Sequence, residues 1–275
     1  MIKRSVVSGA FYPNNPVELK SMLENFFYKA SNTPLTSKPF GIIVPHAGYI
    51  YSGQAAANIY HSLKNYHYKT AVIIAPSHMT DHIDYFVGDY DGYETPFGAI
   101  KTNQELIQSL LKNTEFKFDP IVDSREHSLE VQLPFLYHLN PDIMIVPIIF
   151  CRQNLTNAEK LSKYLSKIMD EDTLIVVSTD LSHFHDAKKA EEIDQKLINY
   201  VVNKDISELY NALADRKCEA CGFGGILTLL YLMQSMPNAK IDNLYYTHSG
   251  RVSGDNSRVV GYFGAVGYID AKETK

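Results

Sequence analysis

Apolar, β-branched runs alternate along this chain with segments whose apolar residues recur at helical spacing. Four of the runs, residues 40–45, 70–76, 143–150 and 173–179, show no polar alternation. A strand with apolar residues on both faces is typical of a parallel sheet that is covered by helices. The pattern therefore predicts an α/β fold built from βαβ units.

Helical patterns fill the intervals between these runs. They cover residues 16–29, 53–65, 103–113, 126–139, 156–169, 187–203, 205–216 and 222–235. Ser52 is the expected cap of the second helix, and Thr156 with Glu159 predicts a capping box before the fifth. Residues 84–100 are rich in Tyr, Gly and Asp and predict a hairpin or a loop on the substrate side. The segment 243–269 predicts two further strands around a Gly/Ser/Asp loop, and 271–275 a frayed tail.

Composition narrows the class of protein. The chain has 275 residues, of which 45% are hydrophobic and 21% charged, and its net charge is −5. An α/β chain of this length is often one domain, so we expect residues 1–275 to form one. No apolar run approaches the roughly 20 residues of a membrane span, and the N-terminus lacks the apolar core of a secretion signal. We therefore expect a cytoplasmic protein without a membrane partner. Its mild acidity and scattered basic residues argue against nucleic-acid binding.

Three of the four predicted strands end in a histidine. His46 follows the first strand and His78 follows the second, while Asp180 and His183 follow the fourth. One histidine at a strand end is more often a structural residue, but ligands of open α/β sheets bind beyond the carboxyl ends of the strands. Neutral imidazoles with a carboxylate nearby suit a divalent transition metal. The pattern favours metal binding or catalysis at this edge. Five further histidines receive no role: His61, His67, His82, His138 and His185.

A cysteine is a further candidate member of this group. Cys221 comes directly before a strongly apolar helical pattern, and a helix N-terminus favours the anionic thiolate. A thiolate also binds iron, zinc and copper. Cys218 and Cys221 form a C-x-x-C pair, but three cysteines in total suggest no disulfide framework. The alternative is that both are buried cysteines that pack as small apolar residues.

His127 lies at the start of the predicted helix over 126–139. At the first turn its ring could point into a site or to water, and its spacing does not separate these alternatives.

Seven motifs, in order along almost the whole chain, resemble the Memo family, whose members share a fold with class III extradiol dioxygenases of the protocatechuate dioxygenase type. They are "GAFYPNNP" at 9–16, "VPHAGYIYSG" at 44–53, "IIAPSHM" at 73–79, "ETPFG" at 94–98, "EHSLEVQLPFL" at 126–136, "STDLSHF" at 178–184 and "CGFGGI" at 221–226. The resemblance implies a single αβ(β)α domain with a central, mostly parallel or mixed sheet flanked by helices.

The resemblance also implies roles for residues. His46, His78 and Cys221 match the metal triad, with Fe(II) as the expected metal and copper or zinc as alternatives. The dioxygenases carry glutamate at the third position, and a thiolate there favours softer metals and can itself be oxidised. Three residues match catalytic or pocket positions: His183 as the base, Asp180 in the same pocket and His127 as a further pocket histidine.

Three functions remain open at this point. The first is a non-haem metal oxidoreductase that acts on a small molecule. The second is a non-catalytic metal-binding adaptor for a peptide. Microbial relatives of this type, AmmeMemoRadiSam system protein B, resemble partners of a radical-SAM enzyme and a small companion protein. The third is hydrolysis through Ser182, His183 and Asp180, but no G-x-S-x-G elbow is present and adjacent Ser182 and His183 have poor geometry for attack.

Overall fold

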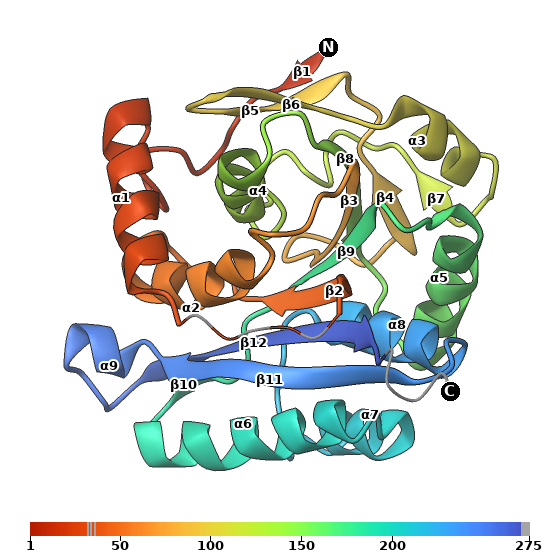
Figure 1. Cartoon of the computed structure of the whole chain (residues 1–275). Helices are drawn as coiled ribbons and strands as arrows, with labels where there is room; N and C mark the ends of the chain where they lie inside the picture. Colours follow the sequence, from red (N-terminus) through yellow and green to blue (C-terminus); the bar gives the residue numbers. More distant parts are fainter. Residues whose placement is uncertain (32, 34, 36, 271–275) are drawn as a thin grey trace.

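A large mixed sheet forms the centre of the computed structural model, which describes residues 1–31, 33, 35 and 37–270 (Figure 1). Four neighbouring strands run parallel in the order β2-β9-β3-β8. Their bounds are β2 (Pro39–Val44), β3 (Thr70–Pro76), β8 (Met144–Phe150) and β9 (Thr173–Ser178). These are the four uninterrupted apolar runs, so the predicted α/β class and its parallel core are confirmed.

Antiparallel strands extend this core on both sides. Beyond β2 lie β12 (Val259–Ile269), β11 (Ala239–His248) and the short β10 (His183–His185), the last two both paired with β12. Beyond β8 lie β4 (Tyr85–Val87) and β7 (Phe116–Lys117). The predicted hairpin in 84–100 is also present. It consists of β5 (Gly92–Thr95) and β6 (Gly98–Lys101), which form a small second sheet with β1 (Ile2–Lys3).

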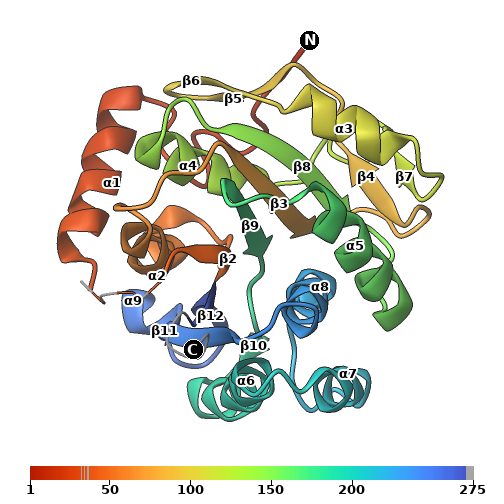
Figure 2. The ribbon, with the colours of Figure 1, turned by 45° about the vertical axis from the view of Figure 1, so that its right-hand side comes forward.

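Helices cover both faces of the parallel strands, as the lack of polar alternation predicts. Figure 2 shows α1 (Pro16–Lys29), α2 (Tyr49–Ser62) and α4 (Leu133–Leu139) on one side, and α5 (Leu155–Ile168) and α8 (Phe223–Gln234) on the other. Alternate residues of β3 enter the two cores: Val72 and Ile74 pack on the α5–α8 side, and Ala71 and Ile73 on the α2–α4 side. The remaining helices are α3 (Gln104–Leu111), α6 (Ala187–Val202), α7 (Ile206–Ala214), the short α9 (Gly250–Ser253) and the 3-10 turn η1 (Glu130–Gln132).

Two predicted helix starts are wrong. Helix α2 begins at Tyr49, and Ser52 lies inside it, with its hydroxyl donating to Ala47 O. The helix starts earlier because the backbone N–H of Tyr49 donates to Phe11 O, so a distant segment binds its first turn. Helix α5 is capped by Asn154 rather than Thr156.

The predicted helix over 126–139 forms only in its second half. Residues up to Leu129 are non-helical, η1 follows, and α4 begins at Leu133. The carboxylate of Glu126 accepts the backbone N–H groups of His127 and Ser128, which holds this segment in a turn and prevents a regular helix start. Within the described residues no helix is long and apolar enough to cross a membrane. The predicted frayed tail, 271–275, falls outside the described residues.

Candidate metal centre

The carboxyl ends of β2, β3 and β9 meet at one edge of the sheet, together with the turn before α8. His46 follows β2, His78 follows β3, and Cys221 precedes α8. The candidate ligand atoms of these three residues all lie within 4.8 Å of one another. Segments far apart in sequence thus bring two imidazoles and one sulfur to one point, in a cluster that could hold a metal ion.

His46 presents its Nε2 lone pair to this point. The Ser178 hydroxyl donates its single proton to Ser128 O at 2.6 Å and accepts a hydrogen bond from Gln132 Nε2 at 2.8 Å. Toward His46 Nδ1, 3.0 Å away, Ser178 can therefore only accept, so Nδ1 carries the proton. Burial, followed by the neighbouring histidines, holds the pKa of His46 well below its usual value. The ring is thus neutral, with Nε2 free to bind a metal.

His78 is oriented in the same way by a buried carboxylate. Glu126 accepts the Nδ1–H of His78 at 2.9 Å and the backbone N–H of His78 at 2.6 Å. The carboxylate has no proton to donate, so His78 also presents Nε2 outward. The hydrogen bond to Glu126 raises the pKa of His78. Although burial opposes ionisation of Glu126, its bonds to His78 and to Ser128 N–H lower its pKa to about 2. This carboxylate–histidine pair has the form that holds metal-binding histidines in place.

Cys221 completes the cluster from the turn before α8. Its Sγ lies 3.3 Å from His46 Nε2 and accepts a hydrogen bond from Asp180 N–H at 3.1 Å. Gly222 allows this close approach, because a Cβ there would lie 2.6 Å from Ser178 O. The predicted activation of the thiol by the helix N-terminus is wrong for the metal-free protein. Burial and the Asp180 charge raise the pKa of Cys221 well above its usual range, so the thiol keeps its proton until a cation replaces it.

The distances fit a transition metal. A histidine nitrogen at about 2.1 Å and a thiolate at about 2.3 Å from a tetrahedral metal lie about 3.6 Å apart. The separation of 3.3 Å between His46 Nε2 and Cys221 Sγ is close to this value. Two nitrogens and one sulfur also suit iron, copper or zinc better than magnesium or calcium, which prefer oxygen ligands.

The remaining predicted residues surround the cluster. The His127 ring stacks on His78 at 4.9 Å between centroids, so it faces the site and not bulk water. Burial lowers its pKa. Asp180 is buried, and its carboxylate accepts the His46 backbone N–H at 2.8 Å. Burial raises the pKa of Asp180. His183 begins β10 and lines the same cavity as Cys221. Their catalytic roles stay predictions.

A second set of possible ligands is better explained as support for the first. His78, Glu126 and His127 also have ligand atoms close together. However, one oxygen of Glu126 already accepts hydrogen bonds from His78 Nδ1, His127 N and Ser128 N, and the other accepts one from His78 N. This saturated carboxylate orients His78. Sequence reasoning missed the roles of Glu126 and Ser178, because each lies far along the chain from the histidine that it orients.

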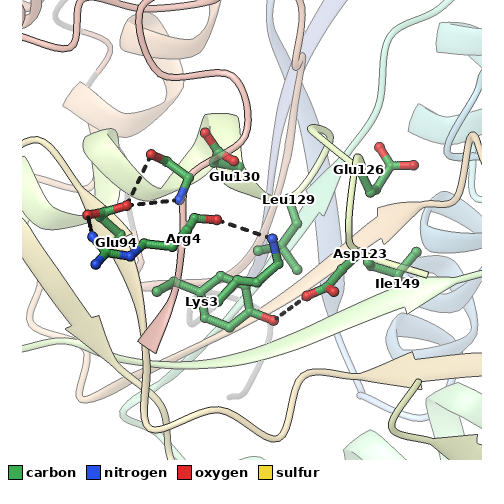
Figure 3. A pocket seen from close by; sticks show the side chains of 10 residues that line it. Lys3, Arg4, Glu94, Asp123, Glu126, Leu129, Glu130 and Ile149 are labelled. Carbon is green, nitrogen blue, oxygen red and sulfur yellow. Dashed lines mark hydrogen bonds and ion pairs between the residues drawn. The ribbon is translucent and has the colours of Figure 1, made fainter. Parts of the chain in front are cut away.

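The N-terminal segment is hydrogen-bonded to Glu130, in the turn that follows Glu126. Figure 3 shows Lys3 and Arg4 beside Glu94, Asp123 and Glu130 around a cavity of about 10 Å³. Glu130 also accepts the backbone N–H groups of Val6 and Val7 and the Tyr12 hydroxyl. A cavity of this size holds at most about one water molecule, so it is no substrate site.

Cys218 and most of the histidines that were expected to have no role make other contacts. Cys218 is buried and packs in the apolar core on the α8 side, in keeping with a small apolar residue. His185 pairs with Glu219, and His82 lies on an exposed loop beside Asp119. His61 and His138 pack against Phe27.

The fold and the cluster together define an α/β protein with a His₂Cys candidate metal centre at the carboxyl edge of its sheet. Comparison with known proteins agrees with this class. The family model described as Memo-like protein matches residues 3–266, and the chain belongs to this family. A MEMO1 family protein of Thermoplasma volcanium is 34% identical over 266 residues, which are 95% of this chain and 97% of that protein. A MEMO1 family protein of Methanocaldococcus jannaschii is 32% identical over 284 residues, with 96% and 98% covered.

Among solved structures, an uncharacterized protein from Escherichia coli K12 aligns with a TM-score of 0.49 and 13% identity, over 82% of this chain and 98% of that one. A likeness this loose carries no functional argument.

Proposed function

We propose that this protein binds a redox-active transition metal through His46, His78 and Cys221 and acts as a non-haem metal-dependent oxidoreductase related to the extradiol dioxygenases. Fe(II) is the metal we expect, with copper or zinc as alternatives. The observation that carries the proposal is the shared orientation of the two histidines. Separate hydrogen bonds fix both Nδ1 atoms as donors, so both Nε2 lone pairs converge on the thiol.

The three side chains would hold a metal at three positions and would leave others for ligands from solvent. A bound iron or copper ion would supply Lewis-acid and electron-transfer chemistry at this point. His46 and His78 would bind through neutral nitrogen. The Cys221 thiol would lose its proton and bind as thiolate, with its sulfur still accepting the hydrogen bond from Asp180 N–H. Asp180 holds the backbone of His46, and we propose His183 as the group that accepts or donates a proton.

The proposal is tested by metal analysis of protein purified without oxygen. We expect close to one equivalent of iron or copper in the wild type and a large loss in Cys221→Ser, because the hydroxyl is a poor ligand for these metals. Cys218→Ser is the matched control, since it changes the neighbouring cysteine, which packs in the apolar core. Equal metal content in all three proteins contradicts the proposal. Oxygen uptake with a panel of catechols after anaerobic Fe(II) loading then tests turnover.

A second function is favoured by one observation, the exposure of the site on the His78 side. The His78 side chain is 36% exposed, and Met79 beside it is exposed too. A peptide, or a partner such as a radical-SAM enzyme and its small companion protein, could contact this side of the cluster. In that case the protein is a metal-binding adaptor. The yield of crosslinked partner should fall in His78→Ala. An unchanged yield would show that the partner does not bind at this site.

A further inference from the structure

A larger cavity, of about 410 Å³, lies beside Cys221 on the side of α7 and α8. Figure 2 shows α7 next to α8, with β10 nearby. Apolar side chains form most of the wall: Leu181, Tyr210, Leu213, Ala220 and Phe223. A cavity of this volume, mostly apolar with a few polar groups, is typical of a site for a small organic molecule.

The cavity shares residues with the metal centre. Cys221 and His183 both line it, so a molecule inside would lie against these two residues. The acidic residue in the wall is already paired, because the Glu219 carboxylate accepts the Nε2–H of His185 at 2.9 Å and the backbone N–H of His183 at 3.3 Å.

Arg216 supplies a free positive charge at the rim. It lines the cavity and is exposed to solvent. Its guanidinium has no hydrogen bond or ion pair with the residues that the structure describes. Lys217, next in the chain, pairs instead with Asp215 and does not line the cavity.

The backbone of Arg216 gives an independent reason to assign it a role. Arg216 has φ +55 at the C-terminal end of α7, where the bonds Arg216 N–Leu213 O and Lys217 N–Ala212 O form a Schellman motif. Glycine is strongly preferred at this position, because other residues are strained there. Lys204 occupies the same place after α6 with φ 58, but its ammonium donates to Ala239 O and so stabilises the fold. Arg216 has no such bond, so the fold itself gains nothing evident from its side chain.

We propose that this cavity binds a small organic anion, with its carboxylate or phosphate at Arg216 and its apolar body between α7 and α8, reaching Cys221 and His183. That this ligand is a substrate rests on the function proposed above. The binding itself depends only on the cavity and on Arg216, and the experiment therefore uses metal-free protein.

The probes are 3-phenylpropanoate, phenyl phosphate and the neutral 3-phenylpropanamide, each titrated calorimetrically. We expect at least one anion to bind about tenfold more tightly than the amide, as one charge-assisted hydrogen-bond pair implies. The better anion shows whether carboxylate or phosphate is preferred. Arg216→Gln should abolish the difference, and Lys217→Gln should keep it. Equal binding of anions and amide, no anion binding below about 10 mM, or an unchanged preference in Arg216→Gln would each overturn the proposal.

Arg216→Gly separates binding from folding. Relief of the strained conformation should raise the Tm by about 2 °C, while affinity for the anion falls about tenfold, as in Arg216→Gln. A lower Tm would show that the Arg216 side chain serves the fold, and would overturn the assignment of this arginine to a ligand.

Discussion

Glu126 binds His78 twice, through the backbone N–H at 2.6 Å and through the ring Nδ1–H at 2.9 Å. The same carboxylate also accepts two further backbone N–H groups from its own turn. One buried side chain thus fixes the position and the tautomer of a candidate metal ligand, and it links the end of β3 to the turn before η1.

Glu126→Gln should weaken metal binding without changing the three proposed ligands. The amide cannot accept all four hydrogen bonds as strongly, and it can present a donor to His78 Nδ1, which would favour the wrong tautomer. We expect a loss of about 10- to 100-fold in affinity, as is typical for such supporting residues. Titration with Zn(II) against a competing chelator measures it. Affinity equal to that of wild type would show that His78 does not depend on Glu126.

The Glu126–His78 pair should also make stability depend on pH. The pKa of Glu126 is lowered to about 2, so its contribution is complete above about pH 4.5 and is lost as the pH falls toward 2. The pKa of His78 is raised, so its contribution is complete below about pH 6.5 and is lost as the pH rises through the folded value. The pair therefore stabilises most between these limits.

Urea unfolding of metal-free wild type and Glu126→Gln at pH 3.5, 5.5 and 8.5 measures this contribution. We expect the difference in unfolding free energy to peak near pH 5.5, at about 2 kcal/mol, and to shrink on both sides. A difference that rises steadily from pH 3.5 to 8.5 would contradict the assigned charge on His78.

Metal affinity should rise with pH. In the metal-free site the thiol of Cys221 is protonated, because burial raises its pKa, and the bond to Glu126 raises the pKa of His78. A metal must replace the thiol proton, and at lower pH the His78 proton as well. We expect about a tenfold gain in affinity per pH unit from the thiol proton, and a steeper gain at pH values below the raised pKa of His78. In Cys221→Ser the gain that comes from the thiol proton should disappear, so the dependence should be about tenfold weaker per pH unit than in the wild type.

Ser178→Ala should affect both the fold and the metal site. It leaves Gln132 Nε2 with one partner fewer and frees His46 Nδ1 from its acceptor. We expect a loss of about 1–3 kcal/mol in unfolding free energy, with weaker Zn(II) binding. Ser162→Ala is the control, since Ser162 is a buried serine of α5 whose hydroxyl donates to Glu159 O. Ser162→Ala should lower the unfolding free energy less than Ser178→Ala does, and it should leave the Zn(II) affinity unchanged. Equal effects of the two variants would argue against a specific role for Ser178.

The sheet could be predicted from sequence because each central strand is apolar on both faces and ends at a histidine or a turn. His46 and His78 follow from this, since parallel strands end at one edge. The place of Cys221 before an apolar helix made it a candidate ligand, but its assignment to one triad with His46 and His78 rested on the family resemblance, because tertiary packing brings the turn before α8 to the cluster.

What escaped prediction depends on contacts between distant segments. Helix α2 begins early because Phe11 O accepts the N–H of Tyr49, and the turn at Glu126 replaces a regular helix because its side chain competes for the backbone donors. Ser178 is the last residue of a buried strand, and its sequence position does not distinguish it from other buried serines. Spacing within one segment carries no signal for any of these.

The most direct test of the central claim is X-ray absorption at the metal edge of protein loaded anaerobically with Fe(II). The arrangement of His46, His78 and Cys221 predicts one sulfur neighbour at about 2.3 Å and two imidazole nitrogens at about 2.1 Å, with the sulfur lost in Cys221→Ser. A spectrum with only nitrogen and oxygen neighbours, the same in both proteins, would contradict it.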